Sequence, residues 1–175
     1  GQRNAPVLFY NDDPPRSGWQ EILLLAEQLA TTPQLLPTAA TDRELTLRLA
    51  HEVCAQDGLG WARRLQLIHT GLQNAGGFPL PIAKYLGKKY GYTPEAGTAS
   101  ASRVALQLQK LSARLRAQRM AGSNYYVGGS LTAVDIYSAT FLTMFKPLPR
   151  EDCKMDEVTR AVFESRDLNT ETALD

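Results

Sequence analysis

The segment from Tyr125 to Pro147 is the feature that most constrains how this chain can fold. It reads YYVGGSLTAVDIYSATFLTMFKP, and Thr132 is followed three residues later by Asp135, the spacing of a helix capping box. In such a box the threonine hydroxyl accepts from the aspartate N–H, while the carboxylate accepts from the threonine N–H. The pattern predicts a helix that begins after Thr132 and stops at Pro147.

The side chains after this cap are apolar on most of the helix circumference, which is typical of a helix enclosed by other helices. They are Val134, Ile136, Ala139, Phe141, Leu142 and Phe145. Leu131 and Ile136 have the positions of a hydrophobic staple over the cap. A carboxylate in such surroundings costs free energy unless its oxygens are hydrogen-bonded, so Asp135 is predicted to be a buried structural cap without a chemical role.

Composition and charge exclude several classes of protein. The 175 residues are 43% apolar, enough for one good core, and nineteen basic against eighteen acidic residues give a net charge of +1, which predicts no nucleic-acid partner. No apolar run approaches about eighteen residues, and no signal-peptide order is present, so no membrane partner is predicted. Cys54 and Cys153 lie far apart, which fits a reduced, cytoplasmic compartment.

The N-terminal part predicts a strand, a turn and a helix. Residues 4–10 (NAPVLFY) favour a strand, 11–15 (NDDPP) a turn, and Ser17 with Gln20 forms a second capping box that opens a helix. Residues 31–40 are rich in Pro, Thr and Ala, as in a linker. We therefore expect an α/β part over 1–30, a linker over 31–40 and an all-helical domain over 41–175.

Helical periodicity continues through the rest of the chain. Thr41 with Glu44 forms a third capping box. Glycines at 58 and 60 interrupt the helical pattern that runs from this box to Leu72, so the region is predicted to be either one kinked helix or two. Further helices are predicted over residues 81–90, 94–120 and 156–167, the last using Val158, Val162 and Phe163, with a weak helical tendency in the tail. The longest carries a seam of Val104, Leu108, Leu111 and Leu115.

The segment from Gly128 to Ile136 (GGSLTAVDI) closely resembles the G-x-S-(L/I)-T-x-A-D-I motif of the glutathione transferase family. In that family the motif starts the sixth helix of an all-helical C-terminal domain. Val134 stands where the family usually has alanine. The resemblance implies a mainly α fold, namely a glutathione transferase C-terminal-like helical bundle preceded by a partial thioredoxin-like α/β unit.

A second resemblance lies near the N-terminus. Residues 5–8 (APVL) resemble the V-P-V-L of the family's thioredoxin-like domain, where the proline is cis and its flanking backbone pairs with the cysteinyl part of glutathione. Arg16 and Ser17 stand where the family has the E-S pair that receives the γ-glutamyl end, with arginine in place of the acid. The resemblance thus implies glutathione-binding roles for Pro6, Val7, Arg16 and Ser17.

The resemblance also implies an activity, the transfer of the glutathione thiol to a hydrophobic electrophile by a cytoplasmic homodimer. The helix with Trp61 and Arg64 would then line the pocket of the second substrate, although Trp61 could equally pack in the core with the neighbouring arginines solvated. The family's thiol-activating residue belongs to a part of the thioredoxin-like unit expected before residue 5, so the catalytic residue is unknown. The alternative function is a non-catalytic interaction or assembly module.

Three other groups of residues carry weaker signals. His51 and Cys54 have a zinc-ligand spacing and His69 lies on the next helical segment, but no further ligands accompany them and no metal site is predicted. Cys54 lies on an apolar face without a nearby cation, so it is predicted to be a small core residue and not a nucleophile. The cluster of Arg114, Arg116 and Arg119 is predicted to be a solvated helix face.

Overall fold

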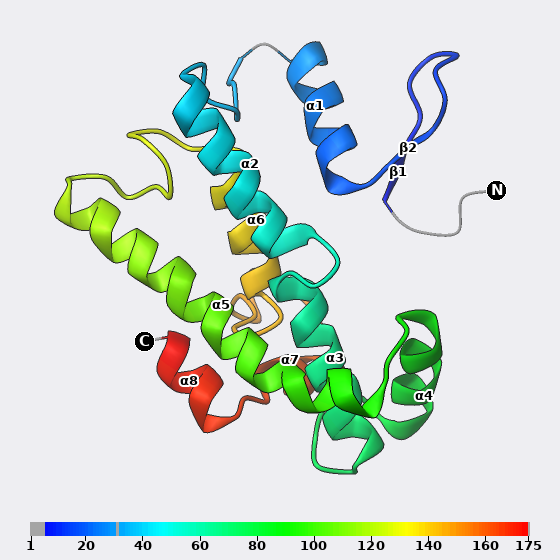
Figure 1. The fold of residues 1–175 in the computed structure, drawn as a ribbon. Helices are drawn as coiled ribbons and strands as arrows, with labels where there is room; N and C mark the ends of the chain where they lie inside the picture. Colours follow the sequence, from blue (N-terminus) through cyan, green and yellow to red (C-terminus); the bar gives the residue numbers. More distant parts are fainter. Residues whose placement is uncertain (1–5, 31, 175) are drawn as a thin grey trace.

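A computed structural model describes residues 6–30 and 32–174 and shows a mainly helical chain with a small antiparallel hairpin near its N-terminus (Figure 1). The element order is β1 (Val7–Leu8), β2 (Arg16–Ser17), α1 (Trp19–Leu29), α2 (Ala40–Cys54), α3 (Leu59–Leu72), α4 (Leu80–Lys89), α5 (Pro94–Met120), α6 (Ala133–Leu142), α7 (Glu157–Glu164) and α8 (Leu168–Leu174). The interruption at Gly58 therefore separates two helices, α2 and α3.

Helix α5 is the long diagonal helix of Figure 1 and packs against α3 and α8. The Thr93 hydroxyl caps its first turn by accepting from the N–H of Ala96 at 3.2 Å, and Pro94 occupies the first turn, where no N–H partner is needed. Val104 and Leu108 are 0% and 3% exposed. The predicted start, end and seam of this helix are confirmed.

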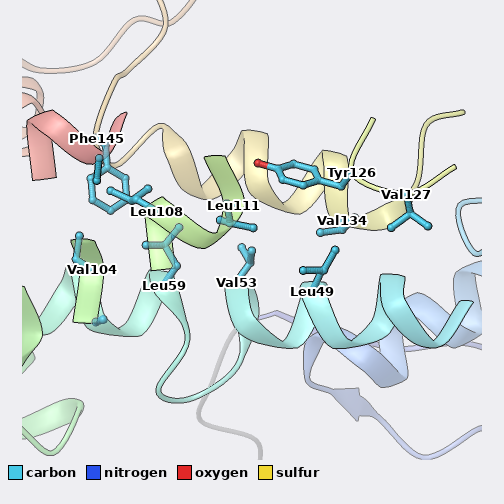
Figure 2. Close-up of a cluster of buried hydrophobic side chains, with 12 residues drawn as sticks. Leu49, Val53, Leu59, Val104, Leu108, Leu111, Tyr126, Val127, Val134 and Phe145 are labelled. Atoms are coloured by element: carbon cyan, nitrogen blue, oxygen red, sulfur yellow. The ribbon is translucent and has the colours of Figure 1, made fainter. Parts of the chain in front are cut away.

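The main core lies where α2, α3, α5 and α6 meet (Figure 2). Leu49 from α2 lies opposite Val134 from α6 and Val53 lies opposite Leu111 from α5, while Leu108 of α5 packs into the same cluster. This cluster brings together segments that are far apart in the sequence, so the helices form one bundle around a shared apolar interior.

Helix α6 is buried on one face only, so the prediction of an enclosed helix is wrong. Val134 is fully buried, whereas Ile136 is 40% exposed and Leu131, its predicted staple partner, 45% exposed. The helix also ends at Leu142, earlier than predicted, because Phe145 N–H bonds three residues back to the Leu142 carbonyl and tightens the chain into turns.

The predicted capping box at Thr132 and Asp135 is confirmed. Asp135 Oδ2 accepts from the Thr132 N–H at 2.8 Å and from the Thr132 hydroxyl at 2.7 Å, and Oδ1 accepts from the Tyr126 N–H at 2.8 Å. Asp135 is half-buried rather than buried. Both carboxylate oxygens are nevertheless bound by the protein, as expected of a structural cap.

The capping boxes predicted at Ser17 and Thr41 are wrong. Ser17 lies in β2, where it pairs with Val7, and α1 begins after Gly18, whose φ of 111° is in the region that favours glycine. Thr41 lies inside α2, which begins one residue earlier without a side-chain cap. In both places backbone pairing or an earlier start overrides the local sequence pattern.

The segment that joins α1 to α2 contacts α1 and the start of α6. Within residues 32–39, the N–H groups of Leu35 and Leu36 donate to the carboxylate of Glu27 at 2.8 and 3.1 Å, and the Leu35 carbonyl accepts from Ala133 N–H at 2.8 Å. Leu36 is 1% exposed and packs with Leu23 and Ala133. Helix α1 is thereby fastened to the start of α6.

Helix α7 presents a different face from the one predicted. Val158 is exposed, whereas Val162 is buried and Arg160 is 4% exposed. Arg160 donates to the carbonyl oxygens of Leu148 and Cys153 at 3.1 and 3.0 Å. The buried face of α7 therefore includes Arg160, whereas the apolar pattern predicted Val158 there.

Candidate functional site

A cavity of about 880 Å³ opens between the hairpin, the start of α1 and the helices α2, α3, α4 and α6. Four residues singled out from the sequence line it, namely Pro6, Ser17, Trp61 and Arg64. Its volume is in the range of pockets for small organic ligands. The structure thus brings two predicted subsites, far apart in the sequence, to one hollow.

The other two residues assigned to glutathione, Val7 and Arg16, are not among the cavity-lining residues. Val7 is half-buried and pairs with Ser17 across the hairpin. Arg16 Nη2 lies 3.1 Å from Asp13 Oδ2 in an ion pair of the turn, and adjacent strand residues point to opposite faces, which separates its side chain from that of Ser17. The Ala5–Pro6 bond, predicted to be cis, lies outside the described residues.

The N-terminus of α1 is open at this cavity. No side chain caps it, because its N-cap residue is Gly18, and both Gly18 and Trp19 line the hollow. The first-turn N–H groups of a helix have no partners within the helix and carry the positive end of its dipole. This end of the cavity is therefore suited to an anionic group such as a carboxylate.

A cluster of aromatic and basic side chains forms the α3–α4 end of the cavity. The rings of Trp61 and Tyr90 meet edge to face at 5.2 Å and 89°. The Arg64 Cζ lies 4.5 Å from the centroid of the Tyr90 ring, and the Lys89 Nζ lies 5.5 Å from it. We call these four residues the cationic corner. Trp61 and Arg64 are both half-buried, so Trp61 is not a core residue and Arg64 is not fully solvated.

The cavity lining also includes Trp19, Tyr137 and Cys54. The two rings meet edge to face at 6.0 Å, and the Tyr137 hydroxyl donates to the Trp19 carbonyl at 3.4 Å. Burial raises the pKa of the Cys54 thiol to about 12, and burial together with this thiol raises the pKa of Tyr137 to about 12. Both groups are neutral near pH 7. Cys54 packs against the core cluster but is half-buried and lines the cavity, so the prediction of a core residue is confirmed only in part.

Arg63, next to Arg64, is a buried structural residue that the sequence analysis did not identify. It is 1% exposed and donates to the carbonyl oxygens of Met144, Phe163 and Ser165 and to the side chain of Gln66. Burial lowers its pKa to about 10. Its position four residues from the buried Leu59 and from the buried Leu67 is the signal that could have placed it on the inner face.

Each of the two histidine rings contacts an aromatic side chain. His51 meets the Trp19 ring edge to face at 6.2 Å, and His69 Nδ1 lies 2.8 Å from the Tyr92 hydroxyl. Over residues 6–30 and 32–174, no group of three or more His, Cys, Asp or Glu side chains is arranged to hold a metal ion. In the same part of the chain every helix is too short or too polar to cross a lipid bilayer.

Several cavity residues carry no motif and were not predicted, among them Lys89, Tyr90 and Tyr137. Lys89 and Tyr90 come from the C-terminal end of α4 and Tyr137 from α6, so only the packing of the helices brings them together. Comparisons with protein-family models, with curated proteins and with solved structures found no match. The function must therefore be argued from the chemistry of the cavity.

Proposed function

We propose that this chain is a glutathione transferase-like protein in which the cavity receives glutathione beside the hairpin and an electrophilic small molecule beside α3. The observation that carries the proposal is the joint position of Pro6 and Ser17 with Trp61 and Arg64 around one hollow. The first pair was assigned to glutathione and the second to the electrophile on separate stretches of sequence. Their convergence supports a two-substrate site.

The hairpin end of the cavity fits the polar part of glutathione. The Ser17 hydroxyl can donate to a carboxylate, and the uncapped N-terminus of α1 adds open N–H groups beside it. Both glutathione carboxylates are anionic near pH 7. We assign this end to one of them, with Pro6 and its backbone next to the cysteinyl part.

In the proposed reaction the glutathione thiol releases its proton to water and the sulfur attacks the electrophilic carbon. A C–S bond forms, and the leaving group departs with the electron pair of the bond that breaks. The cavity residues bind and orient the two reactants, which lowers the entropic part of the barrier. Burial raises the pKa of Cys54 and of Tyr137, so both groups are already protonated near pH 7 and do not accept the thiol proton.

Tryptophan fluorescence gives a direct test, because the chain has two tryptophans and both Trp19 and Trp61 line the cavity. Titration with reduced glutathione should change their emission in a saturable way. Ser17→Ala should weaken binding about tenfold, since one hydrogen bond to a charged group is lost. Ser102→Ala, at an exposed position of α5, is the matched control. Absence of saturable binding to the wild-type chain would refute the proposal.

A second candidate function is a non-catalytic assembly module. It is favoured by exposed apolar side chains on the outer face of α5, where Leu106 is 52% and Met120 90% exposed. Exposed apolar side chains of this kind can become buried between subunits. Sedimentation of wild type against Leu106→Glu tests this function, since a subunit contact through α5 would be lost in the variant. Concentration-independent monomers in both proteins would argue against the module and against the proposed homodimer.

A further inference from the structure

We infer that the second ligand of this cavity is an aromatic anion, whose carboxylate, sulfonate or phosphate group is bound at the cationic corner by Arg64 and Lys89. The inference rests on the proposed two-substrate site and deepens it, because it names the chemical class of the electrophile. It also makes Arg64 and Lys89 the residues that determine specificity between charged and neutral aromatic compounds.

The charges around the cavity favour an anionic ligand. Arg64 and Lys89 both approach the ring of Tyr90, within 4.5 and 5.5 Å of its centroid. No aspartate or glutamate belongs to the cavity lining found among the described residues, and the ion pairs there involve other side chains. Two cations beside one ring repel each other, and an anion between them removes that repulsion.

The position of Arg64 leaves its N–H groups available to an anion. Its guanidinium is held over the Tyr90 ring, and the edge-to-face contact with Trp61 holds that ring in turn. A guanidinium stacked on a ring keeps its N–H groups, which point outward in its own plane, available for oxygen acceptors. Arg64 is half-buried, so a hydrogen bond to an anion there is less screened by water than one at an exposed arginine.

The apolar side chains of the cavity lining determine which kind of ligand body fits. The cavity lining includes Phe141 and Ile136 of α6 as well as Trp61 of the cationic corner. Ile136 is 40% exposed although it lies in the first turn of a core helix, which leaves apolar surface for a ligand to cover. A flat aromatic body fits against rings better than a flexible polar one. With its anionic group at Arg64, such a ligand extends toward Ser17, where the proposed glutathione lies.

Two fluorescent probes with the same aromatic body test this inference. The sulfonate 8-anilinonaphthalene-1-sulfonate and the neutral N-phenyl-1-naphthylamine differ only in the anionic group. We expect the sulfonate to bind the wild-type chain about tenfold more tightly, and its affinity to fall with added sodium chloride while that of the neutral probe does not. Arg64→Met, which keeps an apolar stem, should weaken sulfonate binding about tenfold and leave the neutral probe unchanged.

Lys89→Ala should also weaken sulfonate binding, but by less than Arg64→Met. Lys88→Ala is the matched control, because Lys88 is an exposed neighbour in the last turn of α4 that does not line the cavity. Circular dichroism verifies folding of each variant. If Arg64→Met does not fold, the salt dependence of sulfonate binding in wild type and the two lysine variants test the inference instead. Equal affinities for both probes, or sulfonate binding unaffected by salt and by Lys89→Ala, would overturn the inference. Sulfonate binding without glutathione binding would instead remove the proposed transferase function and leave the anion site standing.

Discussion

Nη2 of Arg63 donates a hydrogen bond of 2.6 Å to the carbonyl oxygen of Ser165, across 102 residues of sequence. The same guanidinium lies 4.7 Å from the centroid of the Phe145 ring and donates from Nε to the Met144 carbonyl. Each of these carbonyls belongs to irregular chain at or beyond the end of a helix, where no intrahelical partner is available. Arg63 therefore fastens the segments after α6 and α7 to α3.

Replacing Arg63 by methionine should lower the free energy of unfolding by about 3 to 5 kcal/mol, because several buried carbonyl groups lose their donors at once. Urea unfolding followed by circular dichroism measures the change. Arg48→Met, at an exposed position of α2, is the control and should change stability by no more than about 0.5 kcal/mol. Hydrogen exchange should show the loss of protection first in α7 and α8. Equal stability of the two variants would contradict this role for Arg63.

Asp135 gives a second prediction about stability. Its carboxylate accepts from the N–H groups of Tyr126 and Thr132, so Asp135→Ala leaves two donors without a partner. We expect the free energy of unfolding to fall by about 2 to 4 kcal/mol. Asp152→Ala, at an exposed position, is the matched control. A loss no larger than that of the control would show that water replaces the carboxylate without cost.

The sequence predicted those parts of the fold that depend on local patterns. The cap at Thr132 and Asp135 and the limits of α5 are confirmed, because capping residues, proline and glycine act through their own backbone. The boxes at Ser17 and Thr41 failed because the same residue types also suit a strand or the interior of a helix. In both cases a pattern of two residues was too short to specify where the helix begins.

The cavity could be predicted only in part. Pro6, Ser17, Trp61 and Arg64 were found from a family resemblance on separate stretches of the chain, whereas Tyr90, Lys89 and Tyr137 belong to no motif. Their contribution depends on how α4 and α6 pack against α3, and helical periodicity does not contain that information. The buried Arg63 was missed for a related reason, since its partners lie about one hundred residues away.

Gly60 and Phe141 provide a test of how tightly the cavity wall is packed. Gly60 is buried in the first turn of α3, and a Cβ there would overlap two carbons of the Phe141 ring. Gly60→Ala should lower the free energy of unfolding by about 1 to 3 kcal/mol, because Phe141 must move. Adding Phe141→Leu should restore part of this loss. A double-mutant cycle measures the coupling, and strictly additive losses would contradict the contact.

The thiol of Cys54 provides a prediction of pH dependence. Burial raises its pKa from 9.0 to about 12, so the folded protein keeps the thiol neutral over a range in which the unfolded chain ionises it. This contribution to stability is complete below pH 9 and is lost progressively as the pH rises to about 12. At pH 8 the folded protein should react with iodoacetamide at Cys54 at least about a hundredfold more slowly than free cysteine does, since only the thiolate reacts. The measurement uses a Cys153→Ser background, and the rate in denaturing urea is the control. A folded rate within tenfold of the urea rate would show that water and reagent reach this wall of the cavity freely.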